Sequence, residues 1–92
     1  MLSIRTTDVF DEDVSRLNKQ GKDLDELWSV VRALKHEDEF DREAYRDHAL
    51  HGEWADTREL HIRGDWLLIY QVEGDELKLI RTGTHSDLFR SW

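Results

Sequence analysis

The second half of the sequence combines the side chains that acid–base chemistry beside a phosphate requires, namely His48, His61, Asp65, Arg81 and His85. An imidazole exchanges a proton near neutral pH, and an arginine offers two parallel hydrogen bonds to phosphate oxygens. In RNA the 2′-hydroxyl is an internal nucleophile, so a base, an acid and a cation suffice for cleavage and no metal is needed. These residue types therefore predict proton transfer next to a phosphate.

Each of these residues also has a structural interpretation. His61 can be an ordinary surface residue, and Arg81 can simply pair with a carboxylate such as Asp65. His48 and His51 form an H-x-x-H pair without a third ligand motif, so no metal site and no other cofactor is expected. Three aromatic residues could supply stacking surfaces for bases, although a tryptophan in a strand is more often core: Trp54, Trp66 and Phe89.

Two amphipathic helices are expected in the first half of the chain. Asp8 is a candidate N-cap, an apolar stripe of period 3.6 follows it, and Gly21 ends the helix. Asp23 with Glu26 three residues later resembles a capping box for a second helix. The apolar stripes consist of Phe10, Val14 and Leu17 in the first helix, and of Leu24, Leu27, Val30, Val31 and Leu34 in the second. Residues 36–47 form a polar connection, with Phe40 and Tyr45 as its expected anchors.

The remaining segments have the period of strands. Residues 3–7 predict a short first strand, Leu60 and Ile62 alternate with polar neighbours, and 66–72 is apolar enough for a central strand. Tight turns are expected at 63–65 and 73–75. In the last strand Arg81 has the parity of Leu77 and Leu79, which implies a bend, a bulge or a sheet edge before it.

The order β-α-α-β-β-β predicts an α+β fold, a single domain over residues 1–92 with two helices packed on one face of an antiparallel sheet. The other face is expected to stay at least partly open, and the five chemical groups could meet at one end of the sheet. The chain has no cysteine, which excludes disulfides and cysteine metal sites, and it has no apolar run of membrane-spanning length. A cytoplasmic location is expected.

Three segments together resemble a known family: His48-Ala-Leu-His-Gly-Glu-Trp54, Arg58-Glu-Leu-His-Ile-Arg-Gly-Asp-Trp-Leu-Leu-Ile-Tyr70 and Leu79-Ile-Arg-Thr-Gly-Thr-His-Ser-Asp-Leu-Phe89. They are similar to the YafQ branch of the RelE/ParE toxin superfamily, and helix motifs extend the match over nearly the whole chain. The resemblance implies an mRNA interferase with a compact microbial-RNase-like fold. It would be the toxin of a type II toxin–antitoxin pair and would cut mRNA in the ribosomal A site.

The resemblance also assigns roles to individual residues. It implies His85 as general acid toward the leaving 5′-oxygen, with His61 or Asp65 as base for the 2′-hydroxyl. Arg81 would stabilise the phosphorane, and His48 would assist by hydrogen bonding or act as an alternative base. The acid and base assignments can be exchanged. Substrate contacts are expected from Trp66, Phe89 and Arg63.

The net charge of −8 departs from the basic character usual in the family, and the Leu-Pro typical of the connection is absent around Phe40. Either a local basic patch suffices for RNA, or the source has an acidic proteome, or RNA engagement is weakened. The patch would comprise Arg58, Arg63, Lys78, Arg81 and Arg90.

Two other functions remain open: a non-enzymatic toxin of the ParE branch, which binds gyrase, and a regulatory partner without activity. The implied partners are a DinJ- or RelB-like antitoxin, mRNA and the ribosome. Operator DNA would be reached only through the antitoxin, and no membrane contact is expected.

Overall fold

The computed structural model describes residues 1–37 and 40–89. The elements in chain order are β1 (Ser3–Thr6), α1 (Asp8–Lys19), α2 (Leu24–His36), β2 (His48–Ala49), the 3₁₀ turn η1 (Gly52–Trp54), β3 (Arg58–Arg63), β4 (Trp66–Glu73), β5 (Glu76–Thr84) and α3 (His85–Phe89). The predicted α+β class and its helix-on-sheet arrangement are confirmed. Within the described ranges, no helix is long and apolar enough to cross a membrane.

The five strands form one sheet in the order β1-β5-β4-β3-β2. The pairs from β2 to β5 are antiparallel as expected, but β1 lies parallel to β5, with Ser3 opposite Glu76 and Thr6 opposite Leu79. The sheet is therefore mixed rather than wholly antiparallel. A parallel pair needs a long crossover, and the two-helix segment between β1 and the rest of the sheet is part of that connection. Strand parity in the sequence carries no information on this direction.

The helix boundaries depend on local caps. The side chain of Thr7, and not of Asp8 as expected, accepts a hydrogen bond from the backbone N–H of Phe10, so Thr7 caps α1. The Thr7 hydroxyl also donates to the Ile80 carbonyl, which ties the start of α1 to β5. Asp23 caps α2 as predicted, through the N–H of Asp25. Glu26 does not complete a capping box, because its carboxylate pairs with Arg63.

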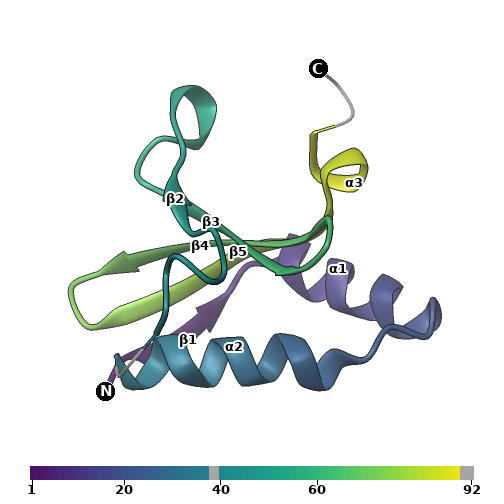
Figure 1. The fold of residues 1–92 in the computed structure, drawn as a ribbon, viewed down its shortest axis with the longest axis horizontal. Coiled ribbons are helices and arrows are strands. Elements are labelled where there is room, and N and C mark those ends of the chain that lie inside the picture. The colour runs from purple at the N-terminus through teal and green to yellow at the C-terminus, as the bar shows by residue number, and fades with distance from the viewer. Residues whose placement is uncertain (38–39, 90–92) are drawn as a thin grey trace.

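Apolar side chains are buried on both faces of the sheet. Helices α1 and α2 cover one face, whereas α3 and the short helical turn that follows β2 rise from the other (Figure 1). The larger core lies on the helix side and contains both predicted helical stripes, with Phe40 and Tyr45 packed against it. A smaller core on the opposite side joins Leu67 and Ile69 of β4 to Leu88 of α3. Because β4 is covered on both sides, its sequence is continuously apolar, as predicted for a central strand.

A bulge in β5 decides which way Arg81 faces. Tyr70 pairs with Leu79, but Ile69 pairs with Arg81, so the register shifts by one residue at Ile80. Paired residues share a face of the sheet, and Arg81 therefore leaves the face of Leu79 and joins that of Ile69. This confirms the bend, bulge or edge implied by its parity in the sequence.

At the edge of the sheet, Arg81 meets Asp13 of α1. Its Nε lies 2.8 Å from Asp13 Oδ2 and its Nη2 lies 2.9 Å from Oδ1, a bidentate pair. Arg16 and the N–H of Thr82 also donate to this carboxylate, which is 1% exposed. Burial alone would raise the pKa of Asp13, but these hydrogen bonds and the charge of Arg81 hold it below its usual value. Arg81 thus pairs with a carboxylate, as its structural interpretation allowed, but the partner is Asp13 rather than Asp65.

Replacing Asp13 by Asn is expected to lower the free energy of unfolding at pH 7 by about 3 kcal/mol, because two arginines lose their buried carboxylate. The folded-state pKa of Asp13 lies below its unfolded value, so its contribution is complete above roughly pH 4 and is lost as the pH falls toward the folded pKa. The variant should therefore lose less stability than the wild type between about pH 4 and pH 2. Urea unfolding at pH 7 and across this range measures both effects.

The matched control for this experiment is Asp11→Asn, which removes the same charge from an exposed position of the same helix. We expect it to change the free energy of unfolding by only about 0.5 kcal/mol. Equal losses in the two variants would show that the Asp13 carboxylate does not stabilise the sheet edge.

Candidate active site

Three imidazoles converge on one buried carboxylate. The Nε2 atoms of His48, His61 and His85 lie 3.7, 3.6 and 3.7 Å from Oε1 of Glu59, respectively. The Glu59 side chain is 4% exposed. The sheet builds this arrangement directly: His48 of β2 pairs with Glu59 of β3, His61 follows two residues later on the same face, and His85 begins α3. The structure thus brings together the three predicted histidines.

The three histidines differ in their contact with solvent. His61 is 15% exposed, whereas His85 at the start of α3 is 56% exposed. Their rings lie 6.1 Å apart. A cavity of about 440 Å³ opens beside His48 and His85, lined by His48, Leu50, His51, Trp54, Glu59, His85 and Phe89. The cluster therefore combines a sheltered imidazole with a solvent-facing one at the wall of an open depression.

Aromatic rings form the rest of that wall. The Phe89 ring lies 5.6 Å from the His85 ring, and the Trp54 ring meets Phe89 edge-on at 5.6 Å. Both aromatic residues are only partly buried and pack on the small core around Leu67 and Ile69. Such partly exposed rings offer the π-faces on which a nucleic-acid base can stack.

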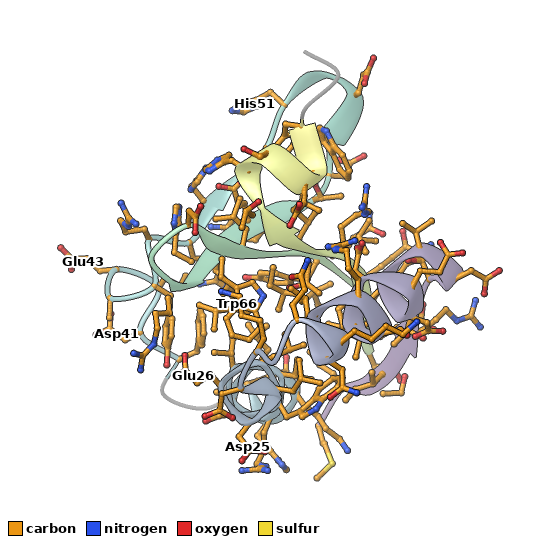
Figure 2. All side chains as sticks on the ribbon, turned by 90° about the vertical axis from the view of Figure 1, so that its right-hand side faces the viewer. Asp25, Glu26, Asp41, Glu43, His51 and Trp66 are labelled. Carbon is orange, nitrogen blue, oxygen red and sulfur yellow. The ribbon has the colours of Figure 1, made fainter. Side chains whose placement is uncertain are left out.

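Trp66 lies away from this wall. It is 3% exposed and belongs to the core on the helix side, where its Nε1–H donates to Thr82 Oγ1. Figure 2 shows Trp66 between the sheet and the helices, while His51 lies on the far side of the sheet near α3. Trp66 therefore offers no stacking surface and has the core position that is more usual for a tryptophan in a strand, because the pleat of β4 turns position 66 toward the helices.

Arg63 is also separate from the histidine cluster. The register shifts between His61 and Arg63, and the guanidinium turns to Glu26 of α2, with Nε–Oε2 and Nη2–Oε1 distances of 2.9 Å. Of the other basic residues in the expected patch, Arg58 donates to the buried carboxylate of Asp47. Arg90 lies outside the described residues.

Asp65 and Arg81 lie at opposite sides of the cluster. Trp66 and Thr84 form the last residue pair between β4 and β5. Asp65 precedes Trp66 and His85 follows Thr84, so both lie at this end of the sheet, where His61 also lies. Glu59 of β3 pairs with Ile69 of β4, and Ile69 pairs with Arg81 of β5. Two strand spacings therefore separate the backbone of Arg81 from that of Glu59, a distance of about 10 Å. The guanidinium of Arg81 turns away to Asp13, and the hydrogen bonds to that carboxylate raise the pKa of Arg81.

Sequence reasoning missed Glu59 and Arg46. Glu59 has the same strand parity as His61, so the alternation that put His61 on the open face already put Glu59 there. Arg46 comes from the polar connection, and its Nη2 lies 3.0 Å from Nδ1 of His61. No periodic pattern marks that loop position.

Comparisons with known proteins agree with this geometry. The family model described as "Bacterial toxin of type II toxin-antitoxin system, YafQ" matches residues 2–90. The mRNA interferase toxin YafQ of Escherichia coli K12 is 35% identical over 80 residues, which cover 87% of each chain.

Solved structures give the same result. The E. coli DinJ–YafQ complex contains a chain with a TM-score of 0.88 and 32% identity, covering 97% of this chain and 99% of that chain. A metal-bound toxin from Helicobacter pylori has a TM-score of 0.87 and 43% identity, covering 97% and 100%. These matches do not favour the gyrase-binding alternative of the ParE branch. The chain belongs to the YafQ family, the bacterial toxins of type II toxin–antitoxin systems.

Proposed function

We propose that this protein is an mRNA interferase whose histidine cluster cleaves the RNA backbone by transphosphorylation. The observation that carries the proposal is the convergence of three imidazoles on buried Glu59 beside an open cavity. The E. coli relative bears the name mRNA interferase toxin, which supports the same chemistry here. The cut would occur in the ribosomal A site.

The reaction transfers one proton at each end of the phosphate. A base removes the proton of the 2′-hydroxyl, the O2′–P bond forms and the P–O5′ bond breaks, while an acid gives its proton to the leaving O5′. We assign the acid to His85, because this imidazole faces solvent at the cavity wall. His61 or Asp65 would be the base, with His48 as the alternative. The centres of the His61 and His85 rings lie 6.1 Å apart, so both imidazoles would act on the same phosphate.

A cation would stabilise the negative charge that develops on the phosphorane. Arg81 is proposed for this role, since the β5 bulge turns its backbone to the face of the cluster. Its Nε and Nη2 already bind Asp13, so it would act through Nη1 or by exchanging a bond to Asp13. Phe89 would stack on a base. Trp66 would contribute by holding Thr82 beside Arg81, and Arg63 by adding positive potential.

The proposed chemistry needs no metal and no other cofactor, because the side chains supply base, acid and cation. One solved relative is a metal-bound toxin. In the described part of this chain, no group of three His, Cys, Asp or Glu residues is arranged to hold a metal ion.

The partners follow from the family and the chemistry. A DinJ- or RelB-like antitoxin is proposed because the E. coli relative was solved in complex with DinJ. Ribosome-bound mRNA in the cytoplasm would be the substrate, and operator DNA would be reached only through the antitoxin. The net charge of −8 makes free RNA a poor ligand, which favours presentation of the substrate by the ribosome.

Replacing His85 by Ala is expected to lower cleavage of a reporter mRNA by about 10²- to 10⁴-fold, the usual contribution of a general acid. Primer extension in a reconstituted translation reaction measures the cuts, which should be phased with codons and should disappear when ribosomes are omitted. His36→Ala is the control, because His36 is exposed at the end of α2 on the other side of the sheet. Growth arrest with intact mRNA would instead indicate a toxin that acts by binding.

The ends of the products provide a second prediction. Attack by the 2′-hydroxyl leaves a 2′,3′-cyclic phosphate or a 3′-phosphate on one fragment and a 5′-hydroxyl on the other. EDTA in the reaction should leave the rate of cleavage of a model oligonucleotide on the ribosome unchanged at fixed free Mg²⁺. Products with 3′-hydroxyl ends, or loss of activity that trace Cu²⁺ or Zn²⁺ restores, would overturn the metal-free mechanism.

A further inference from the structure

Residues 45–48 run behind two of the three imidazoles and contact both at their inner nitrogens. The backbone N–H of His61 donates to the Tyr45 carbonyl at 2.7 Å. His48 Nδ1 lies 2.9 Å from the Arg46 carbonyl oxygen, and Arg46 Nη2 lies 3.0 Å from His61 Nδ1. One residue, Arg46, therefore contacts both rings, through its backbone on one side and its guanidinium on the other.

The neighbouring residue, Asp47, anchors this segment to the sheet. Its side chain is 0% exposed and accepts hydrogen bonds from Arg58 Nε at 2.6 Å, from Arg42 Nη1 at 3.2 Å and from the Tyr70 hydroxyl. Burial and the bond to Asp47 raise the pKa of Tyr70, so its hydroxyl remains a donor. Arg46 itself has a φ of +51°, a left-handed conformation that costs a non-glycine residue about 1 kcal/mol or more. The Asp47 anchor holds the backbone of Arg46 in this conformation.

The contact at His48 defines which of its nitrogens carries the proton. A carbonyl oxygen can only accept, so the hydrogen bond to Arg46 requires a proton on His48 Nδ1. A neutral His48 then has its lone pair on Nε2, the atom that faces Glu59. That lone pair is what a base needs.

The two contacts of His61 Nδ1 require opposite protonation of that atom. Nδ1 lies 3.2 Å from the Gly64 carbonyl, which only accepts, and 3.0 Å from Arg46 Nη2, which only donates. One imidazole nitrogen cannot satisfy both. The guanidinium is always charged, its contact is the shorter one, and hydrogen bonds from charged donors are the stronger class. Nδ1 therefore keeps its lone pair for Arg46, and the proton of neutral His61 sits on Nε2.

We propose that Arg46 is a positioning residue that sets opposite tautomers in His48 and His61. His48 then presents a lone pair at Nε2 and serves as the base, whereas His61 presents an N–H at Nε2 and serves as a hydrogen-bond donor to the phosphate. The catalytic consequence rests on the proposed interferase activity, but the tautomers are properties of the free protein. Of the two histidines proposed as base, His48 is therefore the one whose Nε2 can accept the proton of the 2′-hydroxyl.

NMR of the protein labelled with ¹⁵N-histidine measures the tautomers directly, at roughly pH 8.5 where free imidazoles are neutral. We expect His48 protonated at Nδ1 and His61 at Nε2. Arg46→Ala should switch His61 to the Nδ1–H tautomer, bound to the Gly64 carbonyl, and leave His48 unchanged because its partner is backbone. Arg46→Lys retains a donor and should preserve the wild-type tautomer of His61.

Arg32→Ala is the matched control. It removes the same charge from an exposed position of α2 and should change neither tautomer. Substitution of each histidine by Gln in turn assigns the signals. A wild-type His61 protonated at Nδ1, or an Arg46→Ala variant without the switch, would overturn the proposal whatever the activity of the protein.

Single-turnover cleavage of ribosome-bound mRNA separates this proposal from the proposed function. Arg46→Ala should reduce the rate constant by about 10²-fold, the effect of misplacing a reacting group, while KM changes little and Arg32→Ala cleaves normally. Absence of cleavage by the wild type would contradict the interferase function, yet the NMR result would still decide the tautomers. Normal cleavage by an Arg46→Ala variant that shows the switch would overturn the role of His61 Nε2–H as a hydrogen-bond donor to the phosphate.

Discussion

The architecture around the site depends on the burial of the Glu59 carboxylate. A carboxylate buried away from water is costly unless polar groups lie close to it, and here the Nε2 atoms of three imidazoles on three different elements lie 3.6–3.7 Å from its Oε1 atom. Those elements must therefore meet above one strand. The small core of Leu67, Ile69 and Leu88 holds α3 in that position, and the pairing of β2 with β3 brings His48 across. The small core and the strand pairing thus bring the three histidines to Glu59.

Two further buried carboxylates follow the same rule with arginine in place of histidine. Asp13 binds Arg81 and Arg16 at one edge of the sheet, and Asp47 binds Arg58 and Arg42 at the other. Each carboxylate joins a helix or loop to a strand, Asp13 to β5 and Asp47 to β3. Several of the few cations in an acidic chain are thus committed to internal pairs. The surface that meets RNA has correspondingly little positive charge, which makes presentation by the ribosome more important.

The sequence predicted the elements well and the ion pairs poorly. Alternation in 59–62 and the apolar run 66–72 identified the strands, and the parity of Arg81 indicated a bend, a bulge or a sheet edge, because these patterns are imposed by the pleat itself. The parallel direction of β1 and the short helix α3 produce no periodic pattern in the sequence, so they were not predicted. The strand partners of Asp13 and Asp47 could not be read from the sequence either, since both carboxylates lie in acidic stretches and no periodic pattern links them to Arg81 or Arg58. Glu59 was within reach, because it shares the parity of His61.

The nearly equal distances from Glu59 to the three imidazoles also bear on how the catalyst is restored between turnovers. After the proposed reaction the former acid lacks a proton and the former base has one too many, so a proton must cross the site before the next substrate can be cut. The three Nε2 atoms are 3.6–3.7 Å from the same oxygen, less than about 1 Å beyond hydrogen-bond length. Small side-chain movements would make that oxygen a relay between the rings. Recovery of the enzyme would then be internal, without dependence on the buffer.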